Sequence, residues 1–156
     1  MKLTKFRIQD YRCINDSGWI ELDDIAVIVG KNESGKTSLL KALWKLNPFH
    51  DVNYNIDREF PSGRRKEKSS DKIVVTARFS LSKEEMAKLA AIHDSAKAVT
   101  EIEVSRRYNG WHYYTFFPNV PDMAKKKLSD LPNSTVDQFK KVIAAINEIV
   151  GAWKKK

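Results

Sequence analysis

The residues best suited to chemistry stand together in one run of eight, residues 30–37, with the sequence GKNESGKT. Glycines at such positions let the backbone turn tightly and approach a ligand without a Cβ in the way. Successive main-chain N–H groups then point inward and bind an anion. A lysine followed by a threonine adds a full positive charge and a hydroxyl ligand for Mg²⁺. The run therefore predicts a phosphate-binding loop, or Walker A motif, for a nucleoside triphosphate.

Two of these residues have specific expected roles. We expect Lys36, as the catalytic cation, to reach the β- and γ-phosphates. We expect the hydroxyl of Thr37 to be the metal ligand, with phosphate oxygens and water filling the remaining positions around Mg²⁺. The N–H groups at the start of the following helix add a partial positive charge, which favours a polyanion at that end.

The flanking residues predict the strand, loop and helix that such a motif requires. Residues 25–29 (IAVIV) form a short apolar run typical of a buried strand. Residues 38–44 carry the apolar spacing of a helix, which we expect to end at Asn47–Pro48 because the residue before proline disfavours α geometry. The expected apolar face of this helix consists of Leu39, Leu40, Leu43 and Trp44.

The composition limits the classes of protein to consider. A chain of 156 residues with 42% apolar content holds one ordinary core, so one domain is expected. The single cysteine, Cys13, excludes an internal disulfide and a cysteine-based zinc site. No apolar stretch approaches the roughly 20 residues that span a bilayer, and we expect a cytoplasmic protein. The net charge of +8 favours a polyanionic partner, of which a nucleotide is one.

Other segments have recognisable patterns. Alternating residues predict strands over residues 3–9, 19–22 and 73–81. Ser82 and Glu85 have the spacing of a capping box, which opens a helix expected to reach about Ile92.

The remaining segments complete the predicted organisation of residues 1–156 as a single, partial domain. Asn109–Gly110 predicts a two-residue hairpin turn with positive φ at both positions, and Trp111 to Phe117 is the returning strand. Residues 47–72 show no sustained period and are expected to form a mobile loop. Residues 133–153 repeat apolar side chains every three or four positions, which predicts a long amphipathic helix.

One part of the usual hydrolytic machinery is missing from the sequence. Hydrolysis normally needs an apolar strand ending in an acidic residue that holds Mg²⁺. After Thr37 no four-residue apolar run ends in Asp-Glu. The nearest candidates end at Asp94 and Glu148, lie in helical patterns and place a polar residue before the acid. The sequence therefore predicts nucleotide binding without efficient turnover.

The N-terminal pattern resembles a known group of ATPases. Residues 3–12 (LTKFRIQDYR), a short strand and the GKNESGKT loop resemble the N-terminal lobe of the SMC/RecF/ABC-type ATPase heads. Within these, the chain most resembles the OLD-family (overcoming lysogenization defect) ATP-dependent endonucleases and their AAA-like relatives. Asn32 and the pair Tyr11–Arg12 carry this resemblance, with support from residues 57–61 and 75–85. It covers residues 1–85 well and the rest loosely.

The resemblance implies an α/β fold with a mixed sheet, namely a P-loop NTPase N-terminal lobe with an antiparallel hairpin and flanking helices. It also implies ATP and Mg²⁺ as cofactors and a role in DNA processing. The signature motif and the Toprim nuclease domain of such proteins are not found in this sequence. We therefore expect an incomplete head, which a C-terminal segment or a homodimer partner completes.

The resemblance also implies which residues contact the nucleotide. Arg12 is placed close to it. The phosphates are placed against the loop and the residue that follows it, which are Gly30, Lys31, Asn32, Glu33, Ser34, Gly35, Lys36, Thr37 and Ser38.

Two alternative functions stay open. A small P-loop kinase of a metabolite or nucleoside needs a lid with arginines, and Arg58, Arg64 and Arg65 are available for one. A basic nucleic-acid-binding module is the other, because the net charge is +8 and Arg106 and Arg107 precede an aromatic strand. Packing within the protein is the favoured role for those aromatic side chains.

Overall fold

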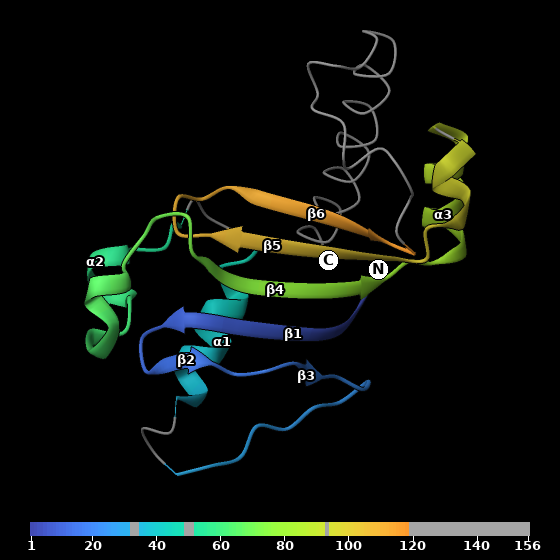
Figure 1. Cartoon of the computed structure of the whole chain (residues 1–156). Coiled ribbons are helices and arrows are strands. Elements are labelled where there is room, and N and C mark those ends of the chain that lie inside the picture. The colour runs from blue at the N-terminus through green and yellow to red at the C-terminus, as the bar shows by residue number, and fades with distance from the viewer. Residues whose placement is uncertain (32–34, 49–51, 93, 119–156) are drawn as a thin grey trace, which may run out of the picture. The chain divides into compact units, whose positions relative to one another are not determined.

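The computed structural model describes residues 1–31, 35–48, 52–92 and 94–118 (Figure 1). These residues form a six-stranded sheet in the order β2-β1-β4-β5-β6, with β3 also paired to β1. Neighbouring strands run in opposite directions. The strands are β1 (Lys2–Tyr11), β2 (Ile14–Asp16), β3 (Ile20–Glu21), β4 (Ile73–Ser80), β5 (Glu101–Arg107) and β6 (His112–Phe117). The helices are α1 (Lys36–Trp44), α2 (Ile56–Glu59) and α3 (Lys83–Ile92), with 3₁₀ segments η1 (Ser62–Glu67) and η2 (Asp94–Ala98).

This α/β architecture, with an antiparallel hairpin and flanking helices, confirms the predicted fold class. The chain divides into two compact units, one of residues 1–2, 80–102 and 115–156 and one of residues 3–79 and 103–114. The second unit contains the phosphate loop, α1 and nearly all of β1. Arg12 and the described residues of the loop therefore belong to one unit.

The strand β1 is the centre of the second unit. Its alternation is as predicted, because Phe6 and Ile8 are fully buried between more exposed neighbours. It pairs antiparallel with β2 through Gln9 and Asp16, and with β3 through Phe6 and Ile20. The predicted strand over residues 19–22 is observed as the shorter β3. We did not predict β2, because its polar residues read as a turn.

The prediction of a buried strand over residues 25–29 is wrong. This segment has no regular secondary structure, and Ile25, Val27, Ile28 and Val29 are 85%, 78%, 39% and 84% exposed. A strand needs neighbours for its backbone N–H and C=O groups. The neighbours of β1 are β2 and β3 on one side and β4 on the other, and no described strand lies beside residues 25–29.

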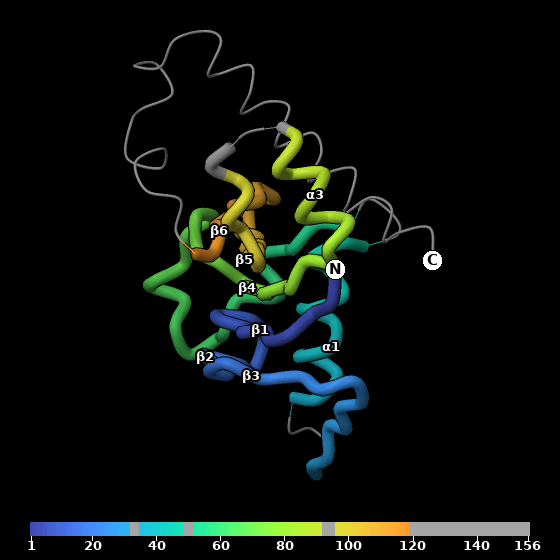
Figure 2. Tube along the Cα trace, turned by 90° about the vertical axis from the view of Figure 1, so that its right-hand side faces the viewer, coloured from blue at the N-terminus to red at the C-terminus, as the bar shows by residue number. Residues whose placement is uncertain are grey.

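The helix α1 confirms the predicted helix after the loop, and Figure 1 and Figure 2 show it next to β1, on one face of the sheet. It ends at Trp44, and Lys45 caps it, so the helix stops before Asn47–Pro48. Its predicted apolar face is only partly covered. Ala42 is its buried residue, whereas Leu40 and Trp44 are exposed large hydrophobic side chains.

Residues 52–72 contain two short helical segments, α2 and η1, where the sequence predicts no regular structure. Asn55 caps α2 because its side chain accepts hydrogen bonds from the N–H groups of Asp57 and Arg58 at 3.0 and 3.1 Å. The buried carboxylate of Asp10, at the end of β1, pairs with Arg64 and lies 3.6 Å from the ammonium of Lys72. These contacts give the segment a defined local structure, and its predicted mobility stays a prediction.

The first unit contains the predicted capping box. The N–H of Ser82 donates to the Glu85 carboxylate at 2.8 Å, and the N–H of Glu85 donates to the Ser82 hydroxyl at 3.3 Å. The same carboxylate accepts two hydrogen bonds from the amino group of Met1, at 2.7 and 2.8 Å. The capping residue therefore also anchors the start of β1.

The predicted hairpin between β5 and β6 is confirmed, but its turn differs from the prediction. Gly110 has a φ of 86°, whereas Asn109 does not have a positive φ. The N–H of Gly110 donates to the carbonyl of Arg107 at 3.0 Å, which closes a four-residue turn whose last residue is the left-handed glycine. A turn of this kind needs only one positive φ.

Four predictions fall on residues outside the described part of the chain. They concern Asn32, Glu33 and Ser34 of the loop and the amphipathic helix over residues 133–153. Among the helices that the structure describes, none has the length and hydrophobicity needed to cross a bilayer.

Candidate nucleotide-binding site

The start of α1 has the geometry that an anion-binding loop requires. Gly35, the residue before the helix, has a φ of 91°, in the left-handed region that favours glycine. No side chain caps the helix, and its first turn contains no acidic residue. Among the described residues, the first turn of α1 therefore places no carboxylate where it would compete with a phosphate group for the positive end of the helix dipole.

Lys36 points back to the loop that precedes it. Its ammonium donates hydrogen bonds to the carbonyl oxygens of Gly30 and Lys31, at 2.5 and 2.6 Å. An ammonium has three donors, so one remains for a ligand even in this arrangement. Because Lys36 is the first residue of α1, its charge adds to that of the helix terminus.

The turn after β1 contacts the start of α1. The Sγ atom of Cys13 lies 3.9 Å from the hydroxyl of Ser38, the third residue of the helix. A Cβ atom placed on Gly35 would come within 3.1 Å of the same sulfur and 3.8 Å of the Ile14 side chain. Glycine is therefore required at position 35 both by its φ and by the approach of this turn.

Substitution of Gly35 by alanine is expected to destabilise the protein by about 1–2 kcal/mol, since a Cβ disfavours left-handed backbone and this one also crowds Cys13. Urea denaturation of the Gly35→Ala variant measures this effect. Gly63→Ala is the matched control, because a Cβ at Gly63 meets nothing within 4 Å. Equal stabilities of the two variants would contradict this account of the loop.

Arg12 lies in the same turn as Cys13. Its φ is 54°, an unusual value for a residue with a side chain, and its N–H donates to the carbonyl of Glu59 at 2.6 Å. Its guanidinium contacts the Glu59 carboxylate at 3.3 Å and stays partly exposed. The residue after Arg12, Cys13, thus contacts the start of α1, and the guanidinium of Arg12 stays accessible to a ligand.

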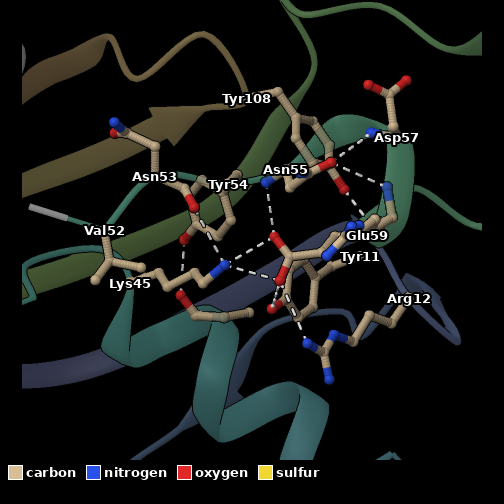
Figure 3. Close-up of polar contacts among 12 residues, drawn as sticks. Tyr11, Arg12, Lys45, Val52, Asn53, Tyr54, Asn55, Asp57, Glu59 and Tyr108 are labelled. Atoms are coloured by element: carbon tan, nitrogen blue, oxygen red, sulfur yellow. Dashed lines mark hydrogen bonds and ion pairs between the residues drawn. The ribbon is translucent and has the colours of Figure 1, made fainter.

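A buried carboxylate connects this turn to the helices (Figure 3). Glu59 accepts hydrogen bonds from the Tyr11 hydroxyl at 2.8 Å and from the Lys45 ammonium at 2.7 and 2.8 Å. It also accepts one from the N–H of Asn55 at 2.8 Å. The end of β1, the end of α1 and the start of α2 therefore meet at one side chain.

The protonation states in this cluster follow from burial and hydrogen bonding. Burial alone raises the pKa of Glu59, but the hydrogen bonds from Lys45, the Asn55 backbone and Tyr11 outweigh it and lower the pKa below its usual value. Burial and the bond to Glu59 raise the pKa of the Tyr11 hydroxyl well above its usual value. Glu59 is therefore an anion at neutral pH, and Tyr11 is a hydrogen-bond donor.

The structure brings together some of the predicted site residues. Gly30, Lys31, Gly35, Lys36 and Ser38 lie around the start of α1, with Arg12 in the adjoining turn. Thr37 is the exposed second residue of α1, where its hydroxyl is accessible to a metal ion. The described residues contain no group of three or more His, Cys, Asp or Glu side chains arranged to hold a metal. The hydroxyl of Thr37 is the kind of oxygen ligand that Mg²⁺ takes beside phosphate oxygens and water.

Sequence reasoning missed Glu59 and its partner Lys45. Glu59 belongs to the segment DREFP, but a charged residue in a segment without apolar periodicity gives no sign that it is buried. Asn55, four positions before Glu59, could have indicated the short helix α2, because asparagine is favoured at helix starts.

The comparison with known protein families supports an ATPase domain. The family model described as AAA ATPase domain matches residues 1–155. A solved structure from a study of the ATP-driven dimerization and DNA-stimulated activation of SMC ATPases is similar, with a TM-score of 0.45 and 15% sequence identity. That alignment covers 76% of this chain and 71% of the other. No curated protein matches the sequence.

The family match covers nearly the whole chain and includes the loop, α1 and the turn that carries Arg12. Phosphate-binding geometry at the start of α1 is what an ATPase domain needs. The chain belongs to the AAA ATPase domain family.

Proposed function

We propose that the protein binds ATP with Mg²⁺ at the start of α1. Lys36 and the N–H groups of the loop and the first helical turn contact the phosphates, and Thr37 provides the protein ligand to Mg²⁺. Arg12 adds a second positive charge beside the nucleotide. The observation that carries this proposal is the uncapped helix start with Gly35 in left-handed conformation and Lys36 directed at the loop.

We further propose that this ATP-binding portion regulates DNA processing, as in the OLD-like and RecF-like ATPases that the N-terminal sequence resembles. The sequence lacks an apolar strand ending in an acidic Mg²⁺ ligand and lacks a signature motif. Efficient hydrolysis therefore requires such residues from a further segment or from a second copy in a homodimer. We therefore expect the described domain to bind ATP even where it does not hydrolyse it efficiently.

The single cysteine provides a direct test of nucleotide binding. Cys13 is exposed and lies against Gly35 and Ser38, so phosphates bound at the start of α1 shield its sulfur. At an ATP concentration ten times the Kd, alkylation of Cys13 by a maleimide is expected to slow about tenfold in the presence of Mg²⁺. Mass spectrometry of the intact protein measures the rate.

Two comparisons make this test specific. The Lys36→Ala variant is expected to lose protection at the same ATP concentration, and unfolding in urea sets the rate for a fully accessible thiol. An alkylation rate that saturating Mg-ATP leaves unchanged would contradict nucleotide binding at α1.

Of the three arginines available for a kinase lid, the structure engages Arg64 elsewhere. Arg64 pairs with Asp10 and Glu67, so it is already engaged within the protein.

One observation favours contact with nucleic acid at the hairpin. Trp111 and Tyr113 are exposed, contrary to the packing role favoured from the sequence, and the guanidinium of Arg107 lies 4.1 Å from the centre of the Tyr113 ring. Arg106, in contrast, is buried and donates to the carbonyl of Lys45. We propose that this hairpin contributes to DNA binding in the intact ATPase.

A further inference from the structure

The backbone conformation of Arg12 must be held by other residues if its side chain is to contact a nucleotide. Its backbone is in the left-handed region, which is unfavourable for a residue with a Cβ and persists only when surrounding contacts impose it. Asp10, two residues earlier, also has a positive φ, 49°. The end of β1 is therefore a strained turn whose geometry depends on the groups that hold it.

Glu59 supplies several of these contacts. Its carbonyl accepts the N–H of Arg12 at 2.6 Å, and its carboxylate accepts the hydroxyl of Tyr11 at 2.8 Å and contacts the Arg12 guanidinium at 3.3 Å. The hydroxyl of Tyr108, which has a single hydrogen to donate, lies between two carbonyl oxygens, that of Asp10 at 2.5 Å and that of Glu59 at 3.0 Å. One residue of α2 thus holds both the backbone and the side chain of the turn.

The charges of this cluster are unequal. Glu59 carries one negative charge, and Lys45 and Arg12 each carry one positive charge, so the three together have an excess of one positive charge. The side chains of Glu59 and Lys45 are 7% and 11% exposed, whereas that of Arg12 is 38% exposed. Lys45 makes the short ion pair, and the excess charge is left on the accessible side chain, Arg12.

We propose that Glu59 is a positioning residue for the nucleotide site, holding Arg12 beside the phosphate loop with its positive charge available to the phosphates. This inference rests on the proposed ATP binding. Cys13, the residue after Arg12, contacts Gly35 and Ser38, so a change in the turn reaches the start of α1 directly. Glu59 acts through Arg12 and does not itself contact the nucleotide.

Two opposite effects on affinity compete when the carboxylate is removed. Removing a negative charge near a polyanion site favours the polyanion, but this effect is weakened over distances of about 8 Å at physiological ionic strength. Losing the hydrogen bonds that hold Tyr11 and Arg12 misplaces a charge that contacts the ligand directly. We expect the second effect to dominate, because the first acts at longer range.

The test is a double-mutant cycle with Glu59→Gln and Arg12→Ala, read as the Kd for Mg-ATP by calorimetric titration. Arg12→Ala is expected to weaken binding about tenfold, and Glu59→Gln about fivefold to tenfold. In the Arg12→Ala background, Glu59→Gln is expected to change the Kd by less than about twofold. A residue that merely supports the fold would weaken binding equally in both backgrounds.

Two further variants make the cycle interpretable. Glu103→Gln breaks another partly buried ion pair of the same unit, with Arg78 at 2.8 Å, and is expected to leave the Kd unchanged. Lys36→Ala tests whether Mg-ATP binds at the start of α1. If Lys36→Ala does not weaken binding, the proposed function fails; if it does and Glu59→Gln does not, only the positioning role fails.

A less disruptive variant, Tyr11→Phe, tests the same role if Glu59→Gln does not fold. Tyr11→Phe removes the hydroxyl bond to Glu59 and keeps the ring, whose edge contact with Tyr54 has a centroid distance of 5.8 Å. It is expected to weaken binding about twofold to fivefold, again only when Arg12 is present. Tighter binding by Glu59→Gln, or losses that add to those of Arg12→Ala, would overturn the positioning role.

Discussion

The Lys36→Ala variant is expected to bind Mg-ATP about tenfold to a hundredfold more weakly than the unchanged protein, as measured by calorimetric titration. The reason is the loss of a charge-assisted contact worth about 1.5–3 kcal/mol. In the structure the ammonium is already at the loop, bonded to the carbonyls of Gly30 and Lys31. Phosphate oxygens carry full charge and are therefore better acceptors for it than these carbonyls.

Lys41→Ala is the matched control for this experiment. Lys41 lies on the same helix, is exposed and is in the last turn, away from the loop. Both variants remove one positive charge, so the general electrostatic effect is shared between them. An equal loss of affinity in both variants would show that Lys36 acts only through the net charge of the protein, and an unchanged affinity in Lys36→Ala would exclude the proposed site.

The second large effect concerns stability. Replacing Glu59 by alanine is expected to lower the free energy of unfolding by about 3–5 kcal/mol, because Lys45 then keeps a buried charge without its partner. For a chain of this size, that loss lowers the Tm by roughly 6–20 °C in a calorimetric scan. Asp16→Ala, which breaks the more exposed pair with Arg7, is the control and is expected to cost less than about 1 kcal/mol.

The double variant Glu59→Leu with Lys45→Met separates a buried charge from lost packing. Because both buried charges are removed and the remaining charge, on Arg12, is partly exposed, it is expected to recover much of the stability lost in Glu59→Ala. A double variant as unstable as Glu59→Ala would show that the hydrogen bonds to Tyr11 and Asn55, and not the unpaired ammonium, account for the loss.

The dependence on pH follows from the direction of the pKa shift. The pKa of Glu59 is lower in the folded protein than its usual value, so its contribution to stability is fully present above the usual carboxyl pKa of about 4.3. That contribution is lost as the pH falls through the lower, folded value. Glu59→Gln is therefore expected to show a smaller loss of stability on acidification than the unchanged protein.

The elements that the sequence predicts well are those with a local cause. The alternation around Phe6 and Ile8 predicts β1, because only one face of that strand is buried. The capping box of Ser82 and Glu85 is confirmed because its hydrogen bonds join residues three positions apart. The helix after the GKNESGKT motif is confirmed, and Gly35 before it has the left-handed backbone that the motif predicts, because both depend on neighbouring residues.

The elements that the sequence does not predict depend on distant neighbours. Residues 25–29 have the composition of a strand, but forming one requires a neighbour to pair with. Glu59 becomes a buried anion only because Lys45, fourteen positions earlier, and Tyr11 converge on it. Similarly, the sequence suggests that Arg106 is a surface cation, whereas in the folded protein it is buried and donates to the carbonyl of Lys45, which follows α1.

The exposed segment of residues 25–29 has a consequence for how this protein behaves at high concentration. Five uncharged residues, three of them β-branched at strongly exposed positions and none of them proline, match the composition that forms intermolecular β-structure. Such a stretch in water promotes self-association unless another protein surface covers it. The net charge of +8 opposes this by mutual repulsion, so added salt shifts the balance towards aggregation.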